Sequence, residues 1–144
     1  MDTSFHYLLL AAQGMFQRRI LARLDGSGLT AGQPKVLNYL GLHNGSVQKN
    51  IALGCQIDPA TLTGLLGRME EKGLVERRAE GGDRRALHVY LTDFGWEKQR
   101  EVLRVLEACD REMLSGLDEA EGAALLRGLR HVCEHLAENR EALQ

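Results

Sequence analysis

The segment from Asp58 to Leu91 constrains the fold more than any other part of the chain, because it predicts one helix followed directly by one β-hairpin. Asp58 followed by Pro59 is typical of a helix start, where the carboxylate caps the helix and proline takes its first position. Apolar residues then recur at helical spacing as far as Lys72. Gly73 is a typical helix stop, so we expect a helix that ends there.

Two short strands are predicted after this helix. The first runs from Leu74 to Ala79 and ends in the turn Glu-Gly-Gly-Asp. In the second, apolar residues alternate with His88 and Tyr90, which is the pattern of a half-buried strand. The hairpin carries two arginine pairs, Arg77–Arg78 and Arg84–Arg85, although the formal net charge of the whole chain is -2.

A shorter helix is predicted before Asp58. We expect it to begin at Ser46 and to end at about Gly54, with a tight turn around Gln56 and Ile57 joining the two helices. Helix, turn, helix and two-stranded hairpin together describe a winged helix-turn-helix. We expect this lobe to span residues 30–91.

Apolar residues at helical spacing predict helices in the rest of the chain as well. They cover Ser4 to about Leu24, Thr30 (as N-cap) to about His43, Thr92 (as N-cap) to about Ser115, and about Glu119 to Leu143. The expected fold class is therefore mainly α with a small β-hairpin wing, in a single domain over residues 1–144.

Composition excludes several classes of protein. Hydrophobic residues make up 44% of the chain, but no apolar run approaches the roughly 20 residues of a spanning helix. No signal peptide is recognisable, so we expect a cytoplasmic protein. Cys55, Cys109 and Cys133 form no CxxC pattern and are expected to be reduced thiols rather than a disulfide framework.

Charge is distributed unevenly between the two parts of the chain. Residues 1–91 contain 11 Lys+Arg and 8 Asp+Glu, whereas residues 92–144 contain 7 and 12. A mildly basic body with an acidic C-terminal segment suggests that one face meets a polyanion and another does not.

The sequence resembles the MarR family of bacterial transcriptional regulators. The stretch ATLTGLLGRMEEKGLVERR is similar to that family's recognition helix running into its wing, and DRRALHVYLTDFG is similar to the return strand and the start of the long dimer helix. The resemblance implies a homodimer in which residues 1–29 and 92–144 supply dimerisation helices. It also implies a sequence-specific DNA-binding regulator that represses an inverted-repeat operator and is released by a small ligand.

The resemblance also assigns residues to DNA binding. Arginines at the wing tip would neutralise phosphates and enter the narrow minor groove, with the hairpin braced by an aspartate. Threonines of the recognition helix would touch thymine methyls or bond bases and phosphates. Arg68 either bonds phosphate or braces the scaffold. The full set is Asp58, Ala60, Thr61, Thr63, Gly64, Arg68, Arg77, Asp83, Arg84 and Arg85.

Two glycines depart from the family pattern. Gly64 stands where many members carry an arginine, and Gly67 stands where an acidic residue is usual. Losing the arginine removes an obvious guanine reader. We therefore expect base specificity to depend on the threonines, Asp58 and the DNA shape that the wing reads.

An effector pocket is implied between the dimer helices and the DNA-binding lobe, for a small aromatic or phenolic ligand. His6, Met15, Leu37 and His43 are its candidate lining residues, and ordinary packing is the alternative for each. Peroxide sensing through a cysteine near the N-terminus is not expected, because no cysteine precedes Cys55.

Other functions receive less support from the sequence. His131 and His135 have a spacing that can hold zinc, but no third ligand is evident, so we predict neither a metal site nor a cofactor. No nucleophile–base pair or phosphate loop appears, which argues against an enzyme. The alternative function is a winged-helix protein-interaction module that does not bind DNA specifically.

Overall fold

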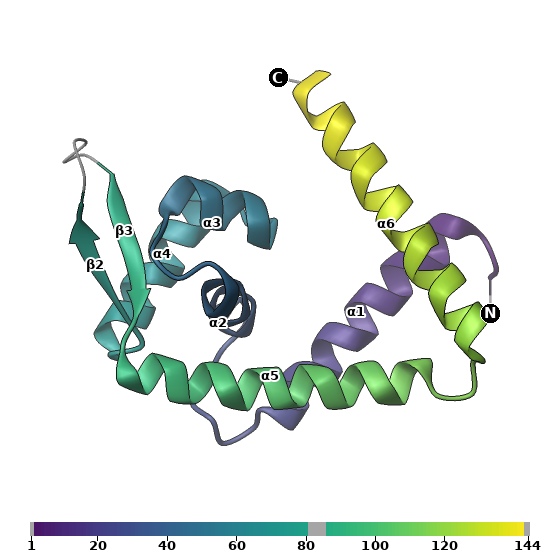
Figure 1. The fold of residues 1–144 in the computed structure, drawn as a ribbon, viewed down its shortest axis with the longest axis horizontal. Coiled ribbons are helices and arrows are strands. Elements are labelled where there is room, and N and C mark those ends of the chain that lie inside the picture. The colour runs from purple at the N-terminus through teal and green to yellow at the C-terminus, as the bar shows by residue number, and fades with distance from the viewer. Residues whose placement is uncertain (1, 81–85, 143–144) are drawn as a thin grey trace. The chain divides into compact units, whose positions relative to one another are not determined.

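The computed structural model describes residues 2–80 and 86–142, and it confirms the predicted class of a mainly helical chain with a small antiparallel sheet (Figure 1). The chain forms two compact units, Met1–Glu107 and Ala108–Gln144. The elements are α1 (Phe5–Arg23), α2 (Gln33–Leu42), β1 (Ser46–Val47), α3 (Gln48–Cys55), α4 (Pro59–Glu71), β2 (Val75–Ala79), β3 (Leu87–Leu91), α5 (Asp93–Leu114) and α6 (Glu119–Ala142).

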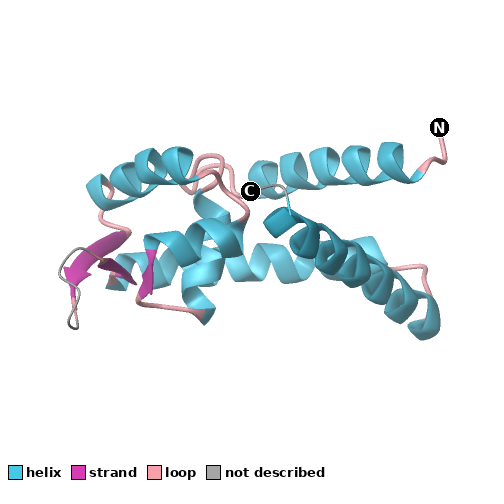
Figure 2. Cartoon of the chain, turned by 90° about the horizontal axis from the view of Figure 1, so that it is seen from above, coloured by secondary structure: helices cyan, strands magenta, loops and turns pink. Residues whose placement is uncertain are grey.

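The sheet has three strands rather than the two that were expected. Its order is β1-β3-β2, and both pairs are antiparallel. Figure 2 draws the strands in magenta. The prediction that Ser46 begins a helix is wrong, because Ser46 and Val47 pair with Val89 and His88 and the helix begins at Gln48. The open edge of β3 supplies backbone partners that local sequence cannot reveal.

The start of α2 also differs from the prediction. Thr30 is not its N-cap; that position belongs to Gly32, whose φ of 87° lies in the left-handed region. Thr30 instead closes a turn with Gln33, accepting from its backbone N–H at 3.1 Å and donating to its side-chain oxygen at 3.1 Å. This turn consumes three residues, so the helix starts at Gln33.

One apolar core joins the helix-turn-helix to the sheet. Inward-facing residues of α2, α3 and α4 pack against β2, β3 and Val102 of α5. The most deeply buried side chains include Leu37, Leu40, Ile51, Leu62, Leu66, Met69, Val89 and Val102. Burial of a leucine-sized side chain stabilises by roughly 1.5–3 kcal/mol, so this core fixes the placement of α4 and the hairpin.

The start of α5 is held against the junction between α4 and β2. Thr92 caps α5 as predicted, accepting from the Gly95 N–H at 2.9 Å, while its hydroxyl donates to the Gly73 carbonyl at 2.5 Å. Gly95 lies directly over the Leu74 carbonyl, and a Cβ there would overlap its oxygen and stand 3.0 Å from its carbon. The glycine of the Leu-Thr-Asp-Phe-Gly motif is therefore required by a close backbone approach.

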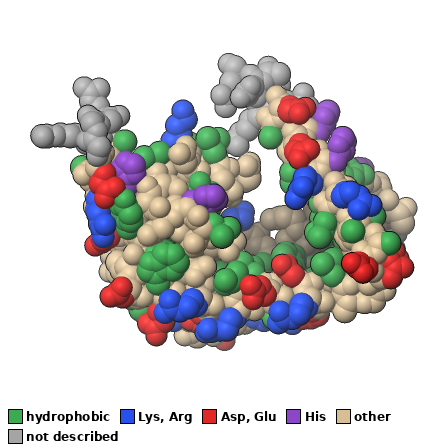
Figure 3. Space-filling view, viewed as in Figure 1, with side chains coloured by type: hydrophobic (Ala, Val, Ile, Leu, Met, Phe, Trp, Pro, Cys, Tyr) green, Lys and Arg blue, Asp and Glu red, His purple; other side chains and the backbone are tan. Residues whose placement is uncertain are grey.

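The second unit consists of the end of α5 and α6. The turn between them contains Gly116, with a φ of 88°. Asp118 and Glu121 then form a reciprocal cap at the start of α6, with distances of 2.8 and 3.3 Å. Several leucines of α6 are exposed, and apolar side chains reach the surface between charged ones in Figure 3.

No helix among residues 2–80 and 86–142 combines the length and the apolar character that crossing a membrane requires.

We expect Gly95→Ala to lower the free energy of unfolding by roughly 1–3 kcal/mol or more, because the added methyl overlaps the Leu74 carbonyl. Gly122→Ala is the matched control, since a Cβ there meets nothing within 4 Å. Alanine in place of this helical glycine should stabilise by up to about 1 kcal/mol. Denaturant unfolding followed by circular dichroism measures both changes; equal effects of the two substitutions would contradict the packing argument.

Candidate nucleic-acid interface and adjoining cavity

The N-terminus of α4 is capped by Asp58. Its carboxylate accepts hydrogen bonds from the backbone N–H groups of Ala60 at 3.1 Å and Thr61 at 3.2 Å. The predicted cap is therefore present, and it satisfies two of the amides that a helix start leaves open. Asp58 also places a negative charge at the positive end of the helix dipole, which stabilises the helix start.

The first turns of α4 present a small and neutral surface. Ala60, Thr61, Thr63 and Gly64 are exposed. The opposite side of the helix is buried through Leu62, Leu65, Leu66 and Met69. None of these four residues has a long side chain of its own, so the backbone of these turns can come close to another surface wherever the flexible Arg68 side chain moves aside.

Thr63 is linked to the preceding helix by a residue that sequence reasoning missed. Its hydroxyl donates to the Pro59 carbonyl at 3.0 Å and accepts from the side-chain amide of Gln48 at 2.6 Å. Gln48 is the first residue of α3, 15 positions earlier in the sequence. No local signal in the sequence relates these two residues, since only the packing of α3 on α4 brings them together.

Arg68 lies over the gap that Gly64 leaves. A Cβ built on Gly64 would be 3.4 Å from an Nη atom of Arg68, one turn further along the helix. Helical side chains lean towards the N-terminus, so the guanidinium covers the face where Gly64 has no side chain. Arg68 is exposed, so its positive charge lies at the surface beside Gly64.

Arg77 connects the hairpin to α4. Its Nε lies 3.1 Å from Oε2 of Glu70, and the Arg77 side chain is the more buried of the two, at 23% exposed. A Cβ built on Gly67 would stand 4.0 Å from an Nη atom of Arg77, so the guanidinium lies beside this glycine at ordinary contact distance. The structure thus places Arg77 as a brace between β2 and α4; its contact with DNA stays a prediction.

Arg78 lies on the other face of the hairpin, among acidic partners. Its Nε donates to Glu76 at 2.9 Å, and its guanidinium stacks 4.3 Å from the ring centre of Tyr90. The Tyr90 hydroxyl donates in turn to Glu80. The hydrogen bond to Glu76 raises the pKa of Arg78, and the bond to Glu80 raises the pKa of Tyr90.

The three remaining wing residues of the predicted DNA-binding set, Asp83, Arg84 and Arg85, lie outside the described residues. In the described part of the hairpin, Arg77 and Arg78 are each paired with a carboxylate. Their positive charge is therefore largely balanced locally.

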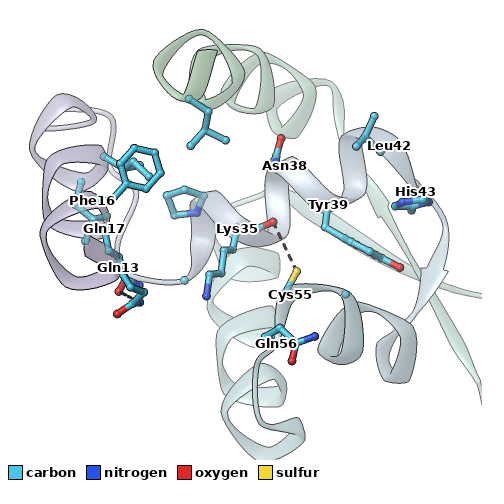
Figure 4. Close-up of a pocket in the computed structure, with 16 residues that line it drawn as sticks. Gln13, Phe16, Gln17, Lys35, Asn38, Tyr39, Leu42, His43, Cys55 and Gln56 are labelled. Atoms are coloured by element: carbon cyan, nitrogen blue, oxygen red, sulfur yellow. Dashed lines mark hydrogen bonds between the residues drawn. The ribbon is translucent and has the colours of Figure 1, made fainter. Parts of the chain in front are cut away.

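A cavity of about 500 Å³ lies between α1, α2 and α3 in the first unit (Figure 4). Its apolar wall consists of Phe16, Ile20 and Leu21 from α1, Pro34 and Leu42 from α2, and Leu106 from α5. Tyr39 lies against His43, with the ring centres 4.7 Å apart and the planes tilted by 37°, and packs on Gly54, where a Cβ would overlap its ring. A volume in this range suits a small organic ligand.

The polar groups of the cavity favour an anion. They are the amides of Gln13, Gln17, Asn38 and Gln56, the imidazole of His43 and the ammonium group of Lys35. None of the described lining residues is acidic, and Lys35 carries the permanent charge. A ligand with a negative group near Lys35 and an apolar body against α1 would satisfy both parts of the surface.

The expected effector residues divide between this cavity and other places. His43 lines the cavity. Leu37 is fully buried in the core, because its side of α2 faces α4 and the sheet. His6 and Met15 lie on exposed positions of α1 and are not among the lining residues that the structure describes. The sequence missed Lys35, since helix membership alone did not show which side faces the cavity.

Burial changes the acidity of Cys55, which also lines the cavity. Desolvation raises the pKa of its thiol to about 11, while the charge of Lys35 opposes this shift. The thiol donates to the Lys35 carbonyl at 3.6 Å. Cys55 is therefore a packed, protonated thiol.

The histidine pair of α6 is exposed. The rings of His131 and His135 lie 6.4 Å apart and nearly parallel. Within residues 2–80 and 86–142, no three His, Cys, Asp or Glu side chains are grouped so that they could hold a metal ion.

Comparison with known proteins identifies related regulators. A family model described as the MarR family matches residues 27–86. The HTH-type transcriptional repressor MdtR of Bacillus subtilis is 33% identical over 115 residues, which cover 78% of this chain and 74% of MdtR. The transcriptional repressor MprA of Escherichia coli is 32% identical over 124 residues, which cover 74% and 70% of the two chains.

Two solved structures are similar to this chain over most of their length. The MepR–DNA complex of S. aureus has a TM-score of 0.85 at 23% identity, covering 94% of this chain and 99% of that one. The repressor CouR bound to a 23-mer DNA duplex has a TM-score of 0.81 at 25% identity, covering 90% and 92%.

The thiols of the described residues should differ sharply in reactivity. At pH 8 only about one Cys55 thiol in a thousand is ionised if its pKa is about 11. Cys133 is exposed. We therefore expect iodoacetamide to modify Cys133 first and to spare Cys55, as peptide mass spectrometry would show.

Cys133→Ser is the control for this measurement, and it should remove the rapid phase of alkylation.

The Cys55 pKa is higher in the folded than in the unfolded chain, so the contribution of this thiol to stability is full below pH 9 and declines as the pH rises towards 11. Rapid alkylation of Cys55 in the folded protein would show that the thiol is not desolvated.

Proposed function

This chain belongs to the MarR family of transcriptional regulators. We propose that it binds an inverted-repeat operator as a homodimer, and that a small aromatic anion releases the homodimer from the operator. It is a DNA-binding transcriptional regulator and not an enzyme. The observation that carries the proposal is the exposed, neutral first part of α4 beside a hairpin that Arg77 and Glu70 tie to the same helix.

The geometry supports α4 as the recognition helix. Its small exposed residues allow the backbone to enter a major groove, which is about 12 Å wide. The ion pair between Arg77 and Glu70 holds β2 to α4, so that helix and wing would meet the duplex as one body. The wing then reaches the neighbouring minor groove, where Arg84 and Arg85 are proposed to neutralise phosphates.

Exposed apolar side chains support a homodimer. In the first unit, α1 exposes Phe5 at 62% and Leu10 at 68%; in the second, α6 exposes Leu126 at 56% and Leu136 at 62%. Large apolar side chains grouped on helices mark interaction surfaces. A second copy of the chain is the proposed partner, and two recognition helices related by a two-fold axis would read the two halves of an inverted repeat.

The cavity supports release by an aromatic anion. Its apolar wall suits a ring, and Lys35 suits a carboxylate. Cys55 and Gln56, which line it, directly precede the turn into Asp58, the cap of α4. A ligand there would therefore push on the turn that positions the recognition helix, and would favour a conformation that no longer matches the operator.

The main proposal includes a cytoplasmic location, because a transcriptional regulator acts where genomic DNA lies. The alternative function is the protein-interaction module. DNA complexes of related structures favour the main proposal. Enrichment of one sequence would favour the main proposal, whereas the absence of any sequence preference would leave the interaction module as the better supported function.

Selection of bound duplexes from a random pool should enrich an inverted repeat whose half-sites lie about 10 base pairs apart. That spacing places two recognition helices in successive major grooves. We expect Arg84→Ala with Arg85→Ala to lower the affinity for the selected site at least tenfold and to reduce its salt dependence, because two phosphate contacts are lost.

Arg100→Ala with Arg104→Ala is the matched control for the wing variant. It removes the same charge from exposed positions of α5. Equal losses of affinity in the two double variants would show that the wing arginines act only through the overall charge of the protein. The absence of any enriched sequence with the native protein would contradict the operator proposal itself.

Lys35→Met tests the polarity of the cavity. We expect benzoate to release the native protein from its operator and benzyl alcohol to have no effect, since only the carboxylate pairs with Lys35. In the variant, the benzoate concentration for half release should rise about tenfold or more, as for loss of a charged hydrogen bond. Fluorescence anisotropy of labelled operator measures the release.

Lys98→Met serves as the control, because Lys98 pairs with Glu101 and does not line the cavity. An unchanged benzoate response in Lys35→Met would exclude Lys35 as the anion partner.

A further inference from the structure

We propose that Gln48 reads an adenine in each operator half-site and that Thr63 holds its side-chain amide in the orientation required for this contact. The inference rests on the proposed DNA-binding function and adds a specificity-determining residue to it. Gln48 does not belong to the predicted recognition helix; it is the first residue of α3.

The hydrogen bonds of Thr63 fix the orientation of the Gln48 amide. A threonine hydroxyl has a single proton, and that proton goes to the Pro59 carbonyl at 3.0 Å. The oxygen can then only accept from Gln48, so the group that faces it at 2.6 Å must be the NH₂ group. The carbonyl oxygen of the amide therefore points away from Thr63.

The rest of the amide is available to a partner outside the chain. Gln48 is half-buried, and its amide makes no second hydrogen bond among residues 2–80 and 86–142. In that part of the chain, the buried side-chain polar atoms without a partner are Ser4 Oγ and Gln33 Nε2. The Gln48 oxygen is unpartnered but absent from this pair, so solvent reaches it.

Gln48 acts at the face that α4 presents. Through Thr63 it is joined to the exposed surface of Ala60, Thr61 and Gly64. Gly64 next to Thr63 has no side chain of its own, and only the end of the flexible Arg68 side chain lies over it. The helices α3 and α4 lie side by side in the helix-turn-helix (Figure 1). The amide is thus held at the edge of the surface that would enter the major groove.

The chemistry of the free groups favours adenine over phosphate. The amide offers one acceptor and one N–H donor side by side, and adenine presents an N6–H donor and an N7 acceptor in the major groove. Phosphate oxygens only accept, so they would leave the Gln48 oxygen unused. Fixing the amide through Thr63 lowers the entropy that binding would otherwise cost.

The decisive experiment compares sequence selection by the native protein with selection by Gln48→Ala, Gln48→Glu and the Thr63 variants. For Gln48→Ala we expect the preference for A·T to vanish at one position in each half-site. Affinity for the native site should fall about tenfold, with an unchanged salt slope, as for one lost bidentate base contact.

Gln48→Glu keeps the shape of the side chain but can only accept hydrogen bonds. We expect the same position to change its preference towards C·G, because a carboxylate accepts from the cytosine N4 amino group. This variant keeps the proposal testable if Gln48→Ala does not fold. Thr63→Val should weaken the preference at that position, whereas Thr63→Ser, which retains the hydroxyl, should preserve it.

Lys49→Ala is the control for a phosphate contact, because Lys49 is the exposed neighbour of Gln48. Loss of a phosphate contact weakens all sequences equally and reduces the salt slope. The same behaviour in Gln48→Ala would overturn the adenine assignment, and so would an unchanged selected sequence. Failure of the native protein to select any sequence would instead contradict the proposed function and this inference together.

Discussion

The close packing of backbone at Gly73 and Leu74 is the constraint on which the arrangement of the helix-turn-helix and the hairpin depends. Here α4 ends, β2 begins, β3 delivers the chain into α5, and all of these segments meet within hydrogen-bonding distance. The Thr92 N–H donates to the Leu74 carbonyl at 3.1 Å, and Gly95 lies against the same peptide. Because these contacts join backbone atoms, contacts made by side chains could hardly take their place.

The consequence is that helix and wing are coupled from two ends. At the base, the junction fixes the direction in which β2 leaves α4. Further out, Glu70 and Arg77 bind the two elements together at 3.1 Å. An exposed ion pair alone contributes little, about 0–1 kcal/mol, so the buried leucines and the junction must supply most of the rigidity and the ion pair the alignment.

Local signals allowed most of the fold to be predicted. Asp58–Pro59, Gly73 and the alternation in β3 each depend on neighbours in the sequence, and the structure has the elements they indicate. The predicted helix start at Ser46 was wrong because β1 exists only through pairing with β3. The predicted N-cap at Thr30 was wrong because the left-handed Gly32 sets the start of α2. Both depend on contacts that periodicity does not encode.

The site could be predicted only in part for the same reason. The exposed threonines of α4 follow from the helix alone. The pairing of Gln48 with Thr63, the pairing of Arg77 with Glu70 and the position of Lys35 on the cavity follow from how helices pack. The family pattern predicts which helix approaches DNA, whereas the partners of its side chains depend on how the helices pack.

The shared wall between the cavity and the helix-turn-helix has a thermodynamic consequence. Cys55 and Gln56 line the cavity while also leading into the cap of α4, so ligand and operator would compete for the shape of one short segment. Coupling between two sites is reciprocal: if bound ligand lowers the affinity for the operator by some factor, bound operator lowers the affinity for the ligand by the same factor. Protein already bound to DNA would then have the lower affinity for the ligand, and the free protein would respond at lower ligand concentrations.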